Sequence, residues 1–314
     1  MKIVTIEDNK NNIVKKHQDL VHNARYRLGD TAIKTLSLLI SMIKVSDDKF
    51  HQYIIKLSDF KELTNADTNE VFKYVDRMTT DLMSKPFWVG NSKFNWVTIA
   101  KYKEGEGVVV FEIHQELKPY LLELKKNFLQ YNITNILPLK SGYIIRLYEI
   151  CKDHYNESIR YKESKKHVTF ELEIDKIKET FEIPKSYLYK DIRVNIIDKA
   201  VTQFKAKTDI QISYTEQKLG RRVDRILITV EENNKGSNDH MKNLQKFIAY
   251  IRTNYTNKKI IESTDKYTSQ QVLLSVSEAG KLYNKKTTTP IDPKRSQELW
   301  QSLYDMNKSG LINL

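Results

Sequence analysis

Two stretches of the chain repeat the same order of apolar and polar positions. FELEIDKIKETF, which begins at residue 170, aligns without a gap with YIIKLSDFKELT, which begins at residue 53. In both stretches apolar residues first alternate, as in a half-buried strand, and then take up helical spacing. A chain that carries this strand-to-helix pattern twice is expected to contain two copies of one structural unit.

Each copy extends in the same way in both directions. In the first copy a helical stripe that includes Leu36 and Ile40 precedes the strand, and a longer helix with Val75 and Met78 on its buried side follows. The second copy repeats this order. Its corresponding apolar residues are Tyr143, Leu147 and Ile150 before the strand, and Val194, Ile197, Val201 and Phe204 after it.

A pair of strands ends each copy. The first pair lies in FWVGNSKFNWVTIAKYKEGEGVVVFEIH and the second in DIQISYTEQKLGRRVDRILITVE. Helix, strand, short helix, turn, longer helix and hairpin is the order of a winged helix, a helix-turn-helix with a β-hairpin wing. The predicted fold is therefore α+β, with two tandem winged-helix domains and a C-terminal, partly helical extension.

The connections set the predicted domain limits. HQELKPYLLELKKNFLQYNI favours a helix with Leu117, Leu121 and Leu124 on one side, and EENNKGSNDH is a polar linker after the second hairpin. We predict a first domain at 1–130, a second at 131–232, and a linker and extension at 233–314 whose role the sequence leaves open.

The first hairpin is rich in apolar residues, among them Trp88, Phe94 and Trp96. Such a hairpin could pair edge to edge with a second molecule, which would make the first domain a dimerisation domain. A plain buried core explains the same residues equally well.

Positive charge is concentrated in the second copy. The chain has 52 Lys and Arg against 40 Asp and Glu, a net charge of +12. Between residues 185 and 225 ten basic residues face five acidic ones, and this stretch is the second long helix and its hairpin. Because a winged helix uses these two elements to hold DNA, the surplus indicates a nucleic-acid partner, although a solvated basic face is the simpler alternative.

Helical geometry selects the candidate DNA contacts. If Val194 and Ile197 turn inward, Asn195 and Lys199 face outward, and Arg193 lies at the edge. Arg and Asn can pair bidentately with guanine and adenine edges, and basic residues at a wing tip suit phosphates or the minor groove. The predicted DNA-binding residues are Lys185, Lys190, Arg193, Asn195, Lys199, Lys218, Arg221 and Arg222, with Lys73 and Arg77 of the first long helix as auxiliary contacts.

Other chemistry finds little support in the sequence. Cys151 is the single cysteine, so multi-cysteine metal sites are excluded, and its apolar neighbours favour an inert buried thiol. The seven histidines never show the His-hydrophobe-His spacing of a tyrosine nickase, His114 suits a strand end better than a ligand role, and no GxxxxGK[ST] motif for ATP occurs. We expect no catalytic residues, no metal, no cofactor and no membrane span, and a cytoplasmic location.

Over about residues 13 to 232 the chain resembles the iteron-binding plasmid replication initiators, Rep proteins with tandem winged-helix domains. The most similar stretch is RVNIIDKAVTQFKAKTDIQISYTEQKLGRRVDRILITVEE, where an arginine opens the helix and a GR pair marks the wing. NARYRLGDTAIKTLSLLISMI of the first domain also fits. Family members are often more arginine-rich just after Arg193, where this chain has Val194 and Asn195.

The resemblance implies a function that spacing alone does not indicate. Such initiators bind direct repeats, called iterons, at a plasmid origin, help to open the duplex and recruit host replication proteins such as the initiator and helicase. The second winged helix is the main reader, and by the match Arg193, Lys218, Gly220, Arg221 and Arg222 carry DNA contact here. A monomer commonly initiates, and a homodimer represses the initiator's own gene.

Two alternatives stay open. A two-domain winged-helix transcriptional regulator has the same fold, and an initiator that represses its own gene is itself a regulator. A tyrosine replication endonuclease is the less favoured alternative, because its histidine pair is missing.

Overall fold

The computed structural model describes residues 3–5, 13–44, 46–56, 71–103, 106–160 and 167–233. Residues 1–233 form one compact unit. The predicted extension, and the predicted short helix of the first copy with its turn, lie outside the described residues. The first domain boundary, near residue 130, stays a prediction.

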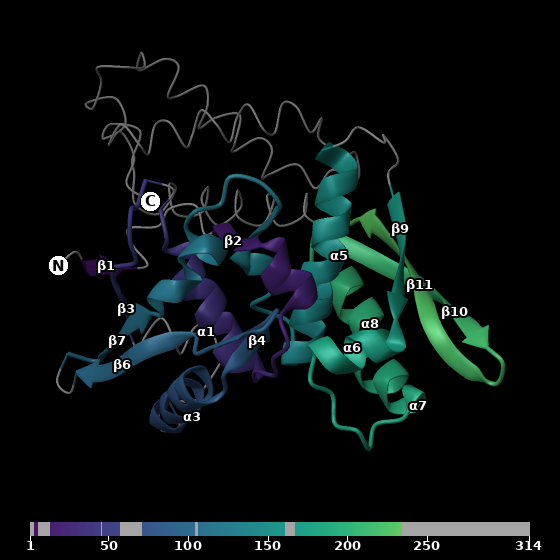
Figure 1. Cartoon of the computed structure of the whole chain (residues 1–314), viewed down its shortest axis with the longest axis horizontal. Coiled ribbons are helices and arrows are strands. Elements are labelled where there is room, and N and C mark those ends of the chain that lie inside the picture. Colours follow the sequence, from purple (N-terminus) through teal and green to yellow (C-terminus); the bar gives the residue numbers. More distant parts are fainter. Residues whose placement is uncertain are drawn as a thin grey trace, which may run out of the picture. The chain divides into compact units, whose positions relative to one another are not determined.

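The first copy is built on helix α1 (Asp30–Ser41), whose residues from Ala32 to Ser41 are all buried. Strand β3 (Gln52–Lys56) follows and lies between β1 (Ile3–Thr5) and β7 in a sheet of order β1-β3-β7-β6 (Figure 1). The remaining elements are α3 (Val71–Ser84), β4 (Phe87–Val89), β5 (Ser92–Phe94), β6 (Val97–Lys103) and β7 (Val108–Ile113).

The apolar hairpin of the first copy contributes to its own core. Trp96 and Phe111 are buried, and the Trp96 ring stacks on Phe87 with centroids 3.7 Å apart. Tyr53 of β3 lies opposite Phe111 of β7, so the alternation that predicted the strand is the register of the sheet. The structure favours the core interpretation of these aromatic residues, and self-association through the hairpin stays a prediction.

The segment between the copies is less helical than its leucine spacing predicts. It forms a 3-10 turn η4 (Gln115–Leu117), one turn of helix α4 (Lys118–Leu121) and then strand β8 (Phe128–Asn132), which pairs with β2 (Ile13–His17). Phe128 and Tyr131 prefer strands, and pairing with β2 buries Leu129 and Tyr131. A 3-10 turn η5 (Ile133–Asn135) follows β8, and a π-helical turn η2 (Asp19–Asn23) follows β2.

The second copy repeats the predicted order. Its elements are α5 (Gly142–Arg160), β9 (His167–Glu173), α6 (Ile174–Thr180), α7 (Tyr189–Ile192), a π-helical turn η6 (Arg193–Ile197), α8 (Asp198–Lys207), β10 (Ile210–Leu219) and β11 (Arg222–Glu232). The strands form an antiparallel sheet of order β10-β11-β9, and the helices cover one of its faces (Figure 1). The repeated pattern therefore marks a repeated fold.

Helix α5 precedes β9 in the predicted second copy and contacts elements of both copies. The buried guanidinium of Arg146 donates to the backbone carbonyls of Ala24 at 2.8 Å and Tyr26 at 3.0 Å, and to that of Thr180 in α6. Lys16 and Tyr131 both donate to the buried Glu149 carboxylate at 2.5 Å. These contacts satisfy charged groups that would be costly to bury alone.

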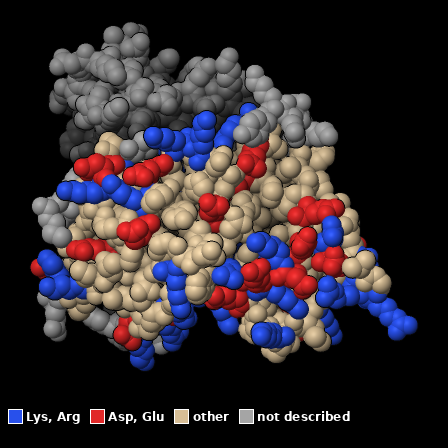
Figure 2. Space-filling model, viewed as in Figure 1, with Lys and Arg blue, Asp and Glu red and all other residues tan. Residues whose placement is uncertain are grey.

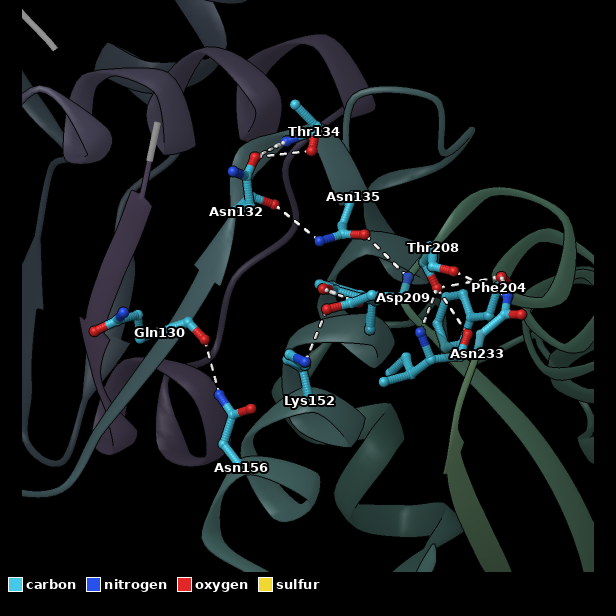
Figure 3. A network of polar contacts seen from close by, with 12 residues as sticks. Gln130, Asn132, Thr134, Asn135, Lys152, Asn156, Phe204, Thr208, Asp209 and Asn233 are labelled. Atoms are coloured by element: carbon cyan, nitrogen blue, oxygen red, sulfur yellow. Dashed lines mark hydrogen bonds and ion pairs between the residues drawn. The ribbon is translucent and has the colours of Figure 1, made fainter. Parts of the chain in front are cut away.

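A polar network joins the end of β11 to the C-terminal end of α8 (Figure 3). The Asn233 side-chain amide donates to the carbonyls of Lys205 at 3.0 Å and Thr208 at 2.9 Å, at the C-terminal end of α8. The Asp209 carboxylate accepts from Tyr148 at 2.8 Å and pairs with Lys152 at 2.8 Å. These contacts bind the end of α8 and the start of β10 to α5.

Candidate nucleic-acid interface

The helix-turn-helix of the second copy consists of α6, a turn, and the segment α7–η6–α8, called the reading helix below. Helix α6 ends in a Schellman motif, in which Ile183 donates to Lys178 and Glu182 to Glu179, with Glu182 at φ 47°. The reading helix packs one side against α5 and the sheet. The buried residues of that side are Ile192, Ile196, Ile197, Ala200 and Phe204.

One predicted core position is wrong. Val194 was expected on the buried stripe with Ile197, but its side chain is 43% exposed. The π-helical turn at Arg193–Ile197 adds a residue to one helical turn, which shifts the face on which residues before it lie. Ile196 is buried in addition to Ile197, while Asn195 and Lys199 remain exposed as predicted.

The predicted DNA-binding residues of the reading helix lie at its exposed start and outer side. Lys185 precedes α7, Lys190 is exposed in its first turn, and Arg193 is only partly exposed. Lys199 Nζ donates to Asn195 Oδ1 at 3.2 Å, one helical turn away. The structure thus places Asn195 and Lys199 in direct contact and leaves both open to solvent.

The wing carries the remaining predicted residues at its tip. Lys218, Arg221 and Arg222 are exposed around Gly220, whose φ of 65° suits a residue without a side chain. Arg222 lies 3.3 Å from both Asp175 and Asp224. Exposed ion pairs of this kind are weak, so Arg222 can exchange its partners for a phosphate at little cost.

Polar contacts that the sequence did not predict join the wing to the reading helix. Glu216 Oε1 on β10 accepts a hydrogen bond from the Tyr189 hydroxyl at 2.8 Å and lies 3.7 Å from Arg193 Nη1. The Tyr214 hydroxyl donates to Asp198 of α8 at 2.6 Å. Strand alternation could have revealed them, because Ile210, Ile212, Tyr214 and Glu216 share the face of β10 that meets the helix.

Both tyrosines stay protonated donors near neutral pH. Burial, as the larger cause, and the hydrogen bond to Asp198 raise the pKa of Tyr214 to about 12. Burial, followed by the hydrogen bond to Glu216, likewise raises the pKa of Tyr189. Each hydroxyl therefore holds a carboxylate in place over the pH range in which the protein would meet DNA.

Helix α3, which takes the corresponding place in the first copy, has both basic and acidic residues on its exposed side. Lys73 and Arg77 are exposed as predicted, but Asp76 lies exposed beside them. The Arg77 guanidinium also lies 6.0 Å from the centroid of the Tyr74 ring. This face is less favourable to a polyanion than that of the second copy.

Figure 2 shows Lys and Arg at the protruding tip of the second wing and near α7, with Asp and Glu gathered closer to the body of the molecule. Exposed apolar side chains accompany this positive charge. Leu188 before the reading helix and Leu219 at the wing tip are each 70% exposed. With Val194 they give the basic surface an apolar component that composition alone did not indicate.

Other kinds of site have little structural basis. Within the described residues, His, Cys, Asp and Glu form no group able to hold a metal ion, and no helix has the length and apolarity of a membrane span. Cys151 is fully buried, and burial raises the pKa of its thiol, which keeps it unreactive. His114 caps the 3-10 turn η4 by accepting from the Glu116 N–H at 3.3 Å.

Comparison with known proteins agrees with this architecture. The family model described as initiator replication protein, WH1, matches residues 13–152, and the model described as initiator Rep protein, WH2, matches residues 173–230. The PI protein of Escherichia coli is 28% identical over 163 residues, which cover 46% of this chain and 52% of that protein. The chain thus spans about half the length of this curated relative.

A solved structure of the Pi initiator protein in complex with iteron DNA has the same fold. It matches with a TM-score of 0.58 and 17% identity over 71% of this chain and 98% of that one. The WH1 match includes most of α5, the WH2 match begins at the end of β9, and the two follow each other in the order in which the repeat occurs. The chain therefore belongs to the family of initiator replication proteins whose WH1 and WH2 modules form tandem winged helices.

Proposed function

We propose that this protein initiates plasmid replication by binding direct repeats at the origin, where it helps to open the duplex and recruits host replication proteins. The observation that carries the proposal is the coincidence of positive charge with the reading helix and wing of the second copy. Its family membership and its similarity to an initiator solved with iteron DNA support the same function.

In the proposed complex the start of the reading helix enters the major groove. That docking brings Arg193 and Asn195 to base edges, where Arg selects guanine and Asn selects adenine. Val194, exposed between them, suits contact with a thymine methyl group. Lys185, Lys190 and Lys199 then lie beside the groove and neutralise phosphates.

The wing holds the adjacent backbone in this arrangement. Lys218, Arg221 and Arg222, all exposed around the turn at Gly220, contact phosphates or the minor groove. Lys73 and Arg77 of α3 add a weaker, auxiliary contact. We thus assign recognition of the base sequence to the second domain and auxiliary DNA contact to the first.

The first domain has a second proposed role. We assign it to homodimer formation, and the dimer to repression of the protein's own gene. The host initiator and helicase are the proposed replication partners. The protein acts without catalysis of its own and needs no cofactor, in the cytoplasm where plasmids replicate.

A transcriptional regulator is the second candidate function, and the common fold favours it as much as initiation. A test uses the purified full chain on its own upstream DNA, with footprinting at several salt concentrations, followed by replication of a plasmid that carries this origin. Protection of direct repeats together with plasmid maintenance is expected. Protection of a promoter without any support of replication would make the protein a regulator, and a metal-dependent nick would make it an endonuclease.

A further inference from the structure

The Glu216 carboxylate occupies an unusual place for an acidic group. It lies on the first strand of the wing, on the side that meets the reading helix, and one oxygen reaches Tyr189 at 2.8 Å and Arg193 at 3.7 Å. A negative charge so close to a DNA-binding surface opposes the phosphate backbone. It therefore weakens binding to any duplex unless it improves some other property of the interface.

Arg193 is the group that this carboxylate can orient. The Arg193 Nε atom is buried without a hydrogen-bond partner, whereas the side chain as a whole is 43% exposed. One edge of the planar guanidinium thus faces the protein and the other faces solvent. Bidentate pairing with a base requires the fork to be held in a fixed orientation, and a free arginine loses rotational entropy when it pairs.

The Glu216 carboxylate is held by one hydrogen bond, and its strand is fixed to the reading helix by a second contact. The Tyr189 hydroxyl donates to the carboxylate from the first turn of the reading helix, and the contact between Tyr214 and Asp198 at 2.6 Å fixes the same strand against α8. The carboxylate is therefore part of a built support between wing and helix, in contrast to the pairs of Arg222 at the wing tip.

We infer that Glu216 is a positioning residue that orients the Arg193 guanidinium toward a base edge and so raises the discrimination between the repeats and other DNA. The inference rests on the proposed function, because it takes Arg193 as a base-reading residue. The charge of Glu216 repels phosphates and lowers the affinity for every duplex alike, which leaves the ratio of the two affinities unchanged. The orientation of Arg193 benefits only the matching sequence, and it is this orientation that raises discrimination.

The test compares four single variants of the full chain, and the double variant Arg193→Ala/Glu216→Gln, on a repeat duplex and on a scrambled duplex at one salt concentration. Glu216→Gln removes the charge and keeps the shape, and Tyr189→Phe removes the hydroxyl that holds the carboxylate without a change of charge. Arg193→Ala removes the oriented group. Glu171→Gln is the matched control, because Glu171 also pairs with an arginine, Arg225 at 2.8 Å, on strands away from the reading helix.

We expect Glu216→Gln to lower the ratio of repeat to scrambled affinity about 5- to 10-fold, with affinity for the scrambled duplex equal to or above that of the unmodified protein. Tyr189→Phe should lower the ratio in the same direction by a smaller factor. Glu171→Gln should change both affinities alike. In the Arg193→Ala background Glu216→Gln should lower the ratio no further, a coupling that a general effect on folding would not produce.

A ratio that Glu216→Gln leaves unchanged, or lowers equally with and without Arg193, would overturn the inference. The result for Arg193→Ala alone tells this failure from that of the proposed function. Loss of discrimination in Arg193→Ala with no effect of Glu216→Gln rejects only the positioning role. Unchanged discrimination in Arg193→Ala rejects both the positioning role and the assignment of the reading helix.

Discussion

In the described residues both winged-helix copies contain a helix, a strand, a longer helical segment and a hairpin in that order, but their hairpins differ. In the first copy β7 lies inside a sheet, and Val109, Val110 and Phe111 are buried. In the second, β10 and β11 run on beyond the buried Ile212 and Ile226 into a polar, basic tip. Both hairpins therefore contribute to a core, and the second also extends past its core into an exposed basic tip that can touch a partner.

Helix α3 and the reading helix also differ in the charge of their exposed sides. The outward side of α3 mixes Lys73 and Arg77 with Asp76, whereas the reading helix has basic residues at its start and a π-turn that exposes Val194. The two scaffolds thus differ in a few surface residues that make the second more suitable for a polyanion. Each prediction below removes one part of this difference.

The largest effect is expected where the copies join. Arg146→Ala should lower the free energy of unfolding by about 3 kcal/mol or more, because three buried carbonyls lose a charged donor. Denaturant unfolding measures the change. Arg160→Ala, at the exposed end of the same helix, is the control and should cost less than about 1 kcal/mol. Equal losses in the two variants would show that α5 does not hold the copies together.

The second effect concerns base reading. Arg193→Ala and Asn195→Ala should each weaken binding to the repeats by about 1–3 kcal/mol and relax base preference where they contact the duplex. Lys73→Ala and Arg77→Ala in the first copy should cost less and leave base preference intact. Affinities measured on repeats with single base changes test this. If the α3 variants lost more discrimination, the roles of the two copies would be reversed.

Sequence patterns predicted most of this arrangement because the two copies supported each other. Alternation at Ile226, Ile228 and Val230 predicted the second wing, and all three residues are buried. The prediction failed where a local deviation breaks the period. A π-turn exposes Val194, and strand pairing with β2 converts the end of a leucine-spaced segment into β8.

The candidate site was predictable in its charges and not in its contacts. Lys199, Lys218 and Arg221 are exposed where helix and hairpin geometry placed them. Strand alternation places Glu216 on the face of β10 that meets the helix, but its 3.7 Å distance to Arg193 depends on how a strand and a helix apart in the sequence pack together. Acidic residues in a basic stretch thus proved as informative as the basic ones.

The third effect concerns the salt dependence of DNA binding, which should depend more on the second wing than on the first. Arg221→Ala and Arg222→Ala should each weaken binding to all sequences alike and reduce the slope of log affinity against log salt by about one unit. Lys101→Ala and Lys103→Ala make the corresponding change in the first wing, where Lys103 already lies 3.4 Å from Glu106. We expect the first-wing variants to alter the slope less. Salt titrations on a scrambled duplex measure it, and equal slopes for both wings would remove the functional difference between the hairpins.

The smallest effect is a pH dependence of stability at His154 of α5, next to His22 of the first copy. Burial, and then the proximity of His22, lowers the pKa of His154 below its usual 6.5, and its ring stacks on Phe170 with centroids 3.9 Å apart. Because the unfolded chain takes up this proton at higher pH than the folded one, the contribution of His154 to stability is complete above about pH 6.5 and declines as the pH falls below it.

His154→Phe keeps an aromatic ring beside Phe170 and removes the titration. The difference in unfolding midpoint between pH 7.5 and pH 5.5 should therefore shrink in this variant, while His167→Gln, at an exposed strand end, should leave it unchanged. If both variants keep the full difference in unfolding midpoint between the two pH values, groups other than His154 cause the loss of stability in acid. A larger difference in His154→Phe would mean that the protonated ring stabilises the fold, with Asp153 and Glu157 outweighing burial.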